Sequence, residues 1–366
     1  MESYDLTVIG RGLSSLLYLK KFYDSKNNHN KKVLIIESSK QIPEKFISAW
    51  QGPGIIDLEK EFGLSYLQSW NDIFVGDSNL KIDRNIYPFF YATFEYKKII
   101  NDLLNFLSSR DITLKYEKVL SLTENENKVV IDAKNTYFSD YVVNSAIDLS
   151  GTSLDNEMMQ IFTGTKIKTS LKHGRESATI MEFKKNEQDI LFFYELPLDE
   201  HEILVETTTF SSKKTIENLK KIHQDRLEQY GEFEVLSKEK GKIPMTTKIK
   251  SSRSRRVINI GTVGGFVRAS SGYSLLRSAK WAAKNGSLPF EKIEIKTNGI
   301  NQWLDKIFLK AIKSFPSKSP EIFLSLFSAK NLKPLIRFLA DHDKYFDRFN
   351  VISNSPKKIM INAIFK

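Results

Sequence analysis

The sequence predicts an α/β fold in three parts: a parallel βαβ unit, then an antiparallel sheet, then helices. Apolar segments at residues 6–9 and 33–36 flank a glycine turn and an apolar helical pattern, which is typical of a βαβ unit. β-Branched and aromatic runs separated by polar turns occupy residues 161–210, as in an antiparallel sheet. Residues 291–366 contain apolar side chains at helical spacing. At roughly 150 residues per domain, 366 residues allow two domains or one large unit with an insert.

The composition excludes several kinds of site. The chain has no cysteine, which excludes disulfides, thiolate zinc sites, iron–sulfur clusters and a cysteine nucleophile. Its five histidines include no pair at the spacing of a helical metal site, so we expect no histidine-rich metal centre. Hydrophobic residues make up 41% of the chain, which is enough for a large core and excludes a wholly disordered protein.

We expect a cytoplasmic protein with no targeting segment and no membrane span. The first apolar stretch runs directly into a glycine turn, unlike a secretory signal. No window approaches the roughly 18 apolar residues of a membrane helix.

The net charge is +11, and residues 301–366 contain 12 Lys and Arg against 5 Asp and Glu. This basic tail fits a solvated helical face or contact with anionic lipid. We expect no nucleic acid partner, because the sequence has no nucleic-acid motif.

The turn after the first strand is suited to a dinucleotide. Gly10 allows a tight turn, and Gly12 lets backbone N–H groups approach a pyrophosphate. Leu13 and Ser14 begin the following helix, whose positive end stabilises phosphate charge. Ser15 stands where such turns usually have a third glycine, and its small side chain still permits close packing of helix on strand.

The second strand of the unit ends in an acidic residue. The carboxylate of Glu37 can accept hydrogen bonds from a ribose hydroxyl, as in other dinucleotide folds. The glycine turn also lies close to the start of the chain, as it does in proteins that bind FAD. By analogy with flavoproteins, we therefore expect FAD as the bound dinucleotide.

A second glycine-rich turn follows a strand at residues 257–260 and leads into another helix. Many FAD proteins hold the ribityl chain and the flavin edge at such a turn. Backbone N–H groups at the helix start can stabilise negative charge on a reduced flavin. The residues that we expect to contact FAD in this part of the chain are Gly261, Thr262, Gly264, Gly265, Gly272 and Tyr273.

The remaining segments suggest a discontinuous arrangement of domains. Residues 43–95 show no regular pattern, whereas helical patterns cover residues 97–106 and about 214–229. We assign the FAD-binding domain to residues 1–75, 96–160 and 250–290. We assign the substrate-binding sheet to residues 76–95 and 161–249, and a basic helical region with membrane contact to residues 291–366.

Several segments together resemble the FAD-dependent lycopene cyclases of bacteria, cyanobacteria and plants. The glycine turn at residues 10–15 fits that family. Residues 192–197, FFYELP, and 203–208, ILVETT, are similar to its aromatic-x-x-Pro strand and its acidic segment. Residues 241–246, GKIPMT, and 270–275, SSGYSL, match two further segments. The order and spacing of the segments carry the resemblance, which covers nearly the whole chain.

The resemblance implies both a fold and a reaction. The fold is that of p-hydroxybenzoate hydroxylase-like flavoproteins, with a Rossmann-type FAD-binding domain and an antiparallel substrate sheet. The reaction is a redox-neutral cyclisation of lycopene ends to ionone rings, as in β-carotene. An alkene is protonated, the neighbouring double bond attacks the cation, and a ring proton is lost. FAD would act in its reduced form, with NAD(P)H as the electron source. Lycopene is confined to the bilayer, so the enzyme would bind membranes peripherally.

The resemblance also assigns roles to residues. It identifies Glu206 as the catalytic carboxyl group, and a dry apolar site would raise its pKa so that it keeps a proton for an alkene. Aromatic rings would stabilise the cation. The residues expected near the substrate are Glu182, Phe193, Tyr194, Glu195 and Met245.

Two other functions share these features. The first is an FAD-dependent monooxygenase or an isoprenoid reductase of the same fold. A monooxygenase would consume O₂ and reductant continuously, whereas a cyclase would not. The second is a membrane-binding flavoprotein without catalysis, in which Glu206 would have no chemical role.

Overall fold

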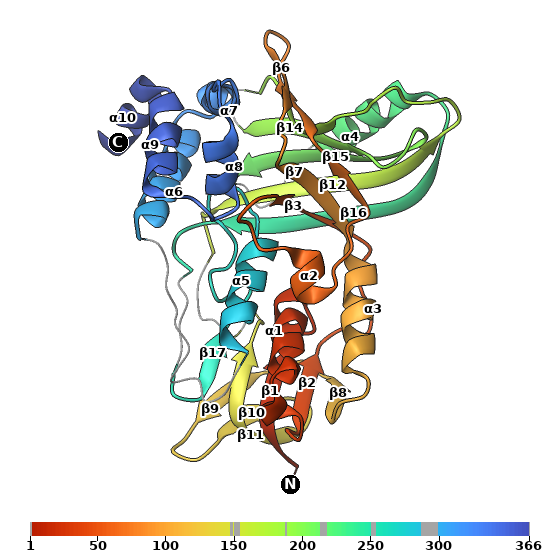
Figure 1. Ribbon diagram of the computed structural model, residues 1–366, viewed down its shortest axis with the longest axis vertical. Coiled ribbons are helices and arrows are strands. Elements are labelled where there is room, and N and C mark those ends of the chain that lie inside the picture. Colours follow the sequence, from red (N-terminus) through yellow and green to blue (C-terminus); the bar gives the residue numbers. More distant parts are fainter. Residues whose placement is uncertain are drawn as a thin grey trace.

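The structure is a computed structural model that describes residues 2–146, 149, 154–186, 189–212, 218–249, 254–286 and 299–365. Figure 1 shows three regions. A sheet with covering helices contains the N-terminus, and a broad sheet lies at the other end of the long axis. The helices of the C-terminal part of the chain lie beside the broad sheet. The predicted α/β fold is confirmed.

The first sheet carries the dinucleotide-type turn. Its strands have the order β8-β2-β1-β11-β10-β9, and β17 pairs with the end of β11 beyond β10. β1 pairs in parallel with β2 and β11, and its apolar residues are buried without alternation, as expected for a strand covered on both faces. The strands are β1 (Ser3–Ile9), β2 (Val33–Glu37), β8 (Ile112–Tyr116), β9 (Ser121–Glu124), β10 (Val129–Asp132), β11 (Thr136–Asn144) and β17 (Val257–Asn259).

Three helices pack beside this sheet: α1 (Leu13–Asp24), α3 (Tyr96–Leu107) and α5 (Leu275–Asn285). α1 contacts both α3 and α5. The hydroxyl groups of Ser14 and Ser278 share a hydrogen bond of 2.7 Å, which joins the first turns of α1 and α5. Two turns that are far apart in the sequence therefore meet at one place.

The broad sheet has the strand order β16-β12-β15-β14-β13-β5-β6. Successive side chains of each strand point to opposite faces. Helix α4 (Leu219–Leu227) packs on β12 and β15 and covers one face, which we call the outer face. Residues 214–217 of the predicted helix lie outside the described residues. The strands are β5 (Asp72–Gly76), β6 (Lys81–Asn85), β12 (Met158–Thr169), β13 (Ala178–Lys184), β14 (Ile190–Pro197), β15 (Glu202–Ser211) and β16 (Phe233–Met245).

The segment at residues 43–95 contradicts the prediction that it lacks regular structure. It contains β3 (Phe46–Gln51), α2 (Leu58–Phe62), β4 (Gln68–Trp70) and β7 (Phe90–Glu95), besides β5 and β6. β3, β7 and β4 form a separate three-stranded sheet. The prediction was wrong because these strands are short and their stability comes from tertiary partners, which leaves little periodicity in the sequence.

The C-terminal helices are α6 (Gly299–Ser314), α7 (Ser319–Phe327), α8 (Lys333–Leu339), α9 (Tyr345–Asn354) and α10 (Lys357–Phe365). Buried Arg268 ties the second glycine-rich segment to them. Its guanidinium lies 3.3 Å from carboxylate oxygens of Asp305 and Asp341 and 4.0 Å from the ring centre of Phe338. Within the described residues, no helix is both long enough and apolar enough to span a membrane.

Candidate functional site

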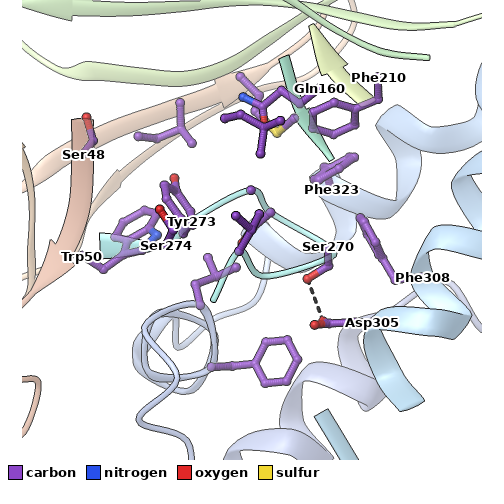
Figure 2. Close-up of a pocket in the computed structure, with 18 of the residues that line it drawn as sticks. Ser48, Trp50, Gln160, Phe210, Ser270, Tyr273, Ser274, Asp305, Phe308 and Phe323 are labelled. Atoms are coloured by element: carbon purple, nitrogen blue, oxygen red, sulfur yellow. Dashed lines mark hydrogen bonds between the residues drawn. The ribbon is translucent and has the colours of Figure 1, made fainter. Parts of the chain in front are cut away.

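A single cavity reaches from the first sheet across the broad sheet to the C-terminal helices. Its volume is about 1050 Å³, and its lining is predominantly apolar. Leu13 and Ser145 line it beside the dinucleotide-type turn, Glu206 lines it on the broad sheet, and Phe308 lines it on α6. Figure 2 shows Phe308, Phe323 and Phe210 gathered on one side of it. A cavity of this size and character is suited to a small molecule or a cofactor.

The first glycine turn has the geometry that its sequence predicts. Gly10 has a φ of +90°, and a Cβ atom there would lie 2.2 Å from Ser145 Oγ, so only glycine fits. Gly12 is the N-cap of α1 and has no side chain with which to cap the helix. The positive end of α1 is therefore left for an anionic ligand.

The residues after Gly12 hold this turn in place. Leu13 lines the cavity, and Ser14 bonds α5 as described above. Ser15, in place of a third glycine, is fully buried and donates to the Oγ of Ser145 at 3.2 Å. A serine is accommodated here because Ser145, which follows β11, supplies a hydroxyl partner for it.

Glu37 ends β2 beside the turn. Its Oε2 accepts the backbone N–H of Arg11 at 2.7 Å, and its Oε1 accepts that of Ser39 at 3.0 Å. Oε1 also accepts the hydroxyl of Ser38 at 3.1 Å. Each carboxylate oxygen has two lone pairs, so acceptor capacity for a ribose hydroxyl remains on Oε2. Its position relative to the glycine turn is the one that a dinucleotide requires.

The second glycine turn follows β17 and packs on the first. A Cβ on Gly261 would lie 3.2 Å from Ser14 Oγ, and one on Gly264 would lie 2.5 Å from the carbonyl oxygen of Asn259. Gly265 has a φ of +74°, and Thr262 lines the cavity. The turn therefore leaves little room for side chains at Gly261 and Gly264, and it borders the cavity at Thr262.

The segment before α5 bridges the two sheets. Gly272 has a φ of +73°, and a Cβ there would lie 2.6 Å from Gln160 Oε1 on β12. Tyr273 lines the cavity, and Ser274 is the N-cap of α5 with no side-chain capping bond. Figure 2 shows this segment between Trp50 and Asp305, with Ser270 donating to Asp305 at 2.7 Å. The start of α5 is thus directed at the cavity beside the glycine turns.

Glu206 lies on β15 and faces the cavity, with 9% of its surface exposed. Thr208, two residues further along the same face, donates a hydrogen bond to its Oε1. Burial raises the pKa of Glu206 well above its usual range, and the negative charge of Glu239 raises it further. Glu206 is therefore a carboxyl group that can keep its proton at neutral pH.

Glu239 on β16 is a cavity residue that the sequence analysis missed. It is 8% exposed, and its Oε2 accepts the backbone N–H of Phe46 at 2.9 Å. Burial also raises its pKa, although Lys45 opposes this shift. In the sequence, Glu239 is marked only by its position two residues before the segment at 241–246. That segment does not indicate which strand lies beside Glu239.

Three tyrosines, Tyr91, Tyr194 and Tyr273, form a hydroxyl cluster in the cavity. The Tyr91 hydroxyl lies 2.9 Å from that of Tyr273 and 3.1 Å from that of Tyr194, which in turn lies 2.8 Å from Ser48 Oγ. Burial raises the pKa of each tyrosine, and the charge of Glu206 raises the pKa of Tyr194 and Tyr273 further. This tyrosine cluster is neutral and lies close to Glu206.

Three residues predicted near the substrate lie on the outer face instead. Arg226 of α4 binds Glu195 through an Nε–Oε1 contact of 2.6 Å, binds Glu182 as well, and stacks 4.4 Å from the ring centre of Phe193. None of these three residues lines the cavity. The placement was wrong because strand side chains alternate, so that Phe192 and Tyr194 face the cavity while their neighbours do not.

Met245, which was also predicted to lie near the substrate, does not line the cavity. It is fully buried in the core, whereas Ile243 and Pro244 of the same strand line the cavity. Among the described residues, no group of three His, Cys, Asp or Glu side chains could hold a metal ion. The groups that line the cavity include carboxyl groups, hydroxyl groups, lysine amines and aromatic rings, beside two glycine turns.

These features define a class of protein: an α/β protein with a dinucleotide-type turn and an apolar cavity that contains buried carboxyl groups. The chain belongs to the lycopene cyclase family, because the family described as "Lycopene cyclase protein" matches residues 5–364. No curated protein sequence matches the chain significantly.

Solved structures share the fold at low sequence identity. A geranylgeranyl bacteriochlorophyll reductase-like protein from Thermoplasma acidophilum has a TM-score of 0.65 and 11% identity, over 99% of this chain and 98% of that one. A flavin-dependent brominase has a TM-score of 0.63 and 12% identity, over 99% and 98%. A p-nitrophenol 4-monooxygenase from Pseudomonas putida has a TM-score of 0.58 and 13% identity, over 100% and 98%. These similarities concern the fold.

Proposed function

We propose that this protein is a flavin-dependent lycopene cyclase that converts acyclic ends of lycopene, or of a related carotenoid, to ionone rings without net oxidation. The place of Glu206 carries the proposal: its carboxyl group lies in an apolar cavity that begins at the dinucleotide-type turn. Membership of the lycopene cyclase family supports the choice of substrate.

The residues present fit FAD. The uncapped start of α1 behind Gly12 would hold the pyrophosphate, Glu37 the ribose, and the turn at Gly261 and Thr262 the part of the cofactor nearest the cavity. When bound and reduced, with NAD(P)H as the electron source, FAD would supply negative charge beside a cationic substrate without being consumed. The start of α5 would favour the same negative charge through its dipole.

Glu206 supplies the proton. An isolated alkene is a weak base, and an ordinary carboxyl group with a pKa of about 4.3 has lost its proton at neutral pH. Burial keeps the proton on Glu206, which can transfer it to a terminal double bond held in the cavity. The charge that appears on carbon then faces aromatic rings, including Tyr194, Phe192 and Phe210. The apolar walls exclude water that would capture the cation.

A membrane supplies the substrate. Apolar side chains are exposed on α9 and α10, and Phe346 and Phe365 reach 81% and 85% exposure. We call this the membrane face: Tyr345, Phe346, Phe349, Ile352, Ile361, Ile364 and Phe365. Four of its members, Phe349, Ile352, Ile361 and Ile364, also line the cavity, so the mouth would open into lipid. Exposed Lys344, Lys357 and Lys358 border it and suit anionic headgroups.

Pigment formation tests the proposal. We would express the chain in a bacterium that accumulates lycopene and identify the product by absorbance and chromatography. Cyclic carotenoid is expected from the natural sequence, whereas Glu206→Gln is expected to lower ring formation by at least about 100-fold and to leave flavin binding intact. The control is Glu202→Gln on the same strand, where Glu202 pairs with Lys166 at 2.7 Å outside the cavity. Linear pigment from the natural sequence would overturn the proposal.

Reductant consumption separates the cyclase from the other flavoproteins of this fold. A cyclase is expected to turn over under anaerobic, reducing conditions with no net loss of NAD(P)H. A monooxygenase would require O₂ in proportion to product, and an isoprenoid reductase would oxidise one NAD(P)H for each bond reduced. A flavoprotein without catalysis would bind flavin and lipid and form no product.

Vesicle binding tests the membrane face separately. Phe346→Ser with Phe365→Ser is expected to reduce cosedimentation with vesicles containing anionic lipid by at least about tenfold, because two exposed aromatic anchors are lost. Leu171→Ser is the control, since Leu171 is 82% exposed in the connection between β12 and β13. Unchanged binding by the double variant would remove the membrane face from the proposal.

A further inference from the structure

The two buried glutamates of the cavity lie in one row across the broad sheet. Glu206 on β15 is directly paired with Gly164 on β12, and Gly164 is directly paired with Glu239 on β16. Directly paired residues point to the same face of a sheet, so both carboxyl groups face the cavity. Tyr194 on β14 extends the row on the other side of Glu206.

Gly164 leaves open the space between the two glutamates. The strands of Glu206 and Glu239 are separated by one strand, or roughly 9–10 Å. The Glu239 side chain leans over that strand: a Cβ on Gly164 would lie 2.8 Å from Glu239 Cγ and 2.9 Å from its Oε1. Any other residue at position 164 would fill this space. The glycine therefore leaves room for the Glu239 side chain to extend over β12, the strand between it and Glu206.

Within the described residues, the hydrogen bonds of the pair leave one buried oxygen, Glu239 Oε1, without a donor. Glu206 Oε1 accepts from Thr208, and Glu239 Oε2 accepts from the backbone of Phe46. Glu239 Oε1 is buried and has no hydrogen-bond partner among the described residues. Within that same part of the chain, neither glutamate belongs to an ion pair with a separation of 4.0 Å or less. A buried carboxylate oxygen without a donor is costly unless a proton is supplied to the site.

Electrostatics favours a single proton on the two groups. Two like charges in an apolar cavity repel, so one carboxyl group ionises and the other keeps its proton. Lys45 is the cation whose charge acts on Glu239, and it is itself buried with a lowered pKa. The other titratable groups that line the cavity are the tyrosine cluster, Lys240, Lys242, Asp305 and Lys357. Asp305 is already paired with Arg268.

We propose that Glu239 is the second carboxyl group of the acid–base site and shares one proton with Glu206 across Gly164. This inference rests on the proposed cyclase function. In the resting site one carboxyl group is protonated and the other is a carboxylate. Neither an oxidant nor a reductant is needed for the proton to pass between them.

The proton balance of cyclisation suits such a pair. Glu206 gives its proton to one carbon of the terminal double bond, and the other carbon becomes cationic. The neighbouring double bond attacks this carbon, which forms the ring bond and moves the positive charge to a ring carbon. A C–H bond beside that carbon breaks, its electrons form the ring double bond, and its proton goes to a carboxylate of the pair. The pair again holds one proton, and the product is an isomer of the substrate.

The pH profile of cyclisation tests the pair. Without the charge of Glu239, the pKa of Glu206 falls, so Glu239→Gln is expected to move the descending limb of kcat by about one pH unit or more towards acid. At neutral pH kcat is expected to fall by about 100-fold, with little change in KM. A residue that only supports the fold would not move the limb. An unchanged limb would overturn the proposal.

An infrared titration tests the shared proton independently of enzymatic activity. The C=O stretch of protonated carboxyl groups is measured against pH in the natural protein, in each single Gln variant and in the double variant. The difference between the natural protein and the double variant is expected to correspond to one protonated carboxyl group at neutral pH. In Glu239→Gln the remaining band is expected to disappear at lower pH. Two protonated groups, or none, would overturn the shared proton even if the protein forms no rings.

Gly164→Ala tests the geometry without removing a titratable group. The added methyl group meets Glu239 Cγ and is expected to displace its carboxyl group, so the infrared band and the pH limb should shift as in Glu239→Gln. Gly299→Ala is the control, because a Cβ there meets no atom within 4 Å. If Gly164→Ala keeps both the natural band and the natural limb, the close approach across Gly164 plays no part and the proposal fails.

Discussion

The two faces of the broad sheet treat the same residue type in opposite ways. On the outer face, Glu195 is fully buried, and Arg226 and Arg175 pair with it at 2.6 and 3.1 Å. On the cavity face, Glu206 and Glu239 are almost as buried, and within the described residues they have no arginine or lysine partner. The partner therefore distinguishes the faces: paired carboxylates hold α4 on the sheet, whereas burial without a close cation raises the pKa of the unpaired ones.

The difference extends to the groups around the carboxylates. On the outer face His223 lies between Thr165 and Thr207, with its ring nitrogens 2.8 and 3.0 Å from their hydroxyl groups. On the cavity face two members of the tyrosine cluster, Tyr194 and Tyr273, lie close enough to Glu206 for its charge to raise their pKa. The outer face is a closed packing layer, and the cavity face remains open to a ligand. Four changes, with effects of decreasing size, should distinguish the outer face from the cavity face.

The largest effect on stability is expected on the outer face. Arg226→Met leaves Glu195 buried without its closest cation and should lower the free energy of unfolding by about 3–5 kcal/mol. Chemical denaturation measures the loss. Lys98→Met is the control, because Lys98 and Asp102 form an exposed pair on α3, and it should cost less than about 1 kcal/mol. Equal losses in the two variants would remove the contrast between the faces.

On the cavity face the corresponding change should stabilise the protein. The folded pKa values of Glu206 and Glu239 are raised, so the folded state binds more protons and loses stability as pH rises above about 4.3. The double variant Glu206→Gln/Glu239→Gln lacks this loss. Its advantage over the natural protein should therefore grow between about pH 5 and 8, at about 1.4 kcal/mol per unit of pKa shift removed. Denaturation curves at several pH values measure it, and a constant difference would contradict it.

His223 should give the opposite pH dependence. Burial lowers its pKa from 6.5 to about 4, so the folded state binds fewer protons and stability is lost as pH falls through this range. His223→Asn should flatten the acid side of the stability curve below about pH 6.5 and leave the alkaline side unchanged. The same denaturation series measures this. If the alkaline side of the stability curve flattens instead, the assignment of His223 to the acid side and of the cavity glutamates to the alkaline side is contradicted.

The smallest effect is expected at Thr208. Its hydroxyl stabilises the charged form of Glu206, so Thr208→Val should raise the pKa of Glu206 further. The descending limb of the cyclisation profile should then move towards alkaline pH by less than about one unit, the worth of one hydrogen bond. Thr209→Val is the control, since Thr209 lies next to it on the opposite face. A shift towards acid would contradict the role of this hydrogen bond.

The sequence alone predicted what depends on local geometry. Gly10 marks the turn between β1 and α1 because only a residue without a side chain can pass so close to Ser145, and Gly12 leaves the start of α1 without a side-chain cap. The apolar runs of β1 and β2 and the strands at residues 161–210 were recognisable for a similar reason, since burial of one or both faces sets their period. Glu206 became a candidate through its surrounding segment and the family resemblance.

Only the tertiary structure decided which face each strand residue occupies. The sequence shows that Phe193 and Tyr194 point in opposite directions, but the placement of α4 determines that Tyr194 meets the cavity. Likewise, Glu239 lies in one row with Glu206 through the pairing of β15, β12 and β16, whose residues are distant along the chain. The periodicity of apolar residues in the sequence indicates that a side chain is buried. The strand order and the covering helices determine what it is buried against.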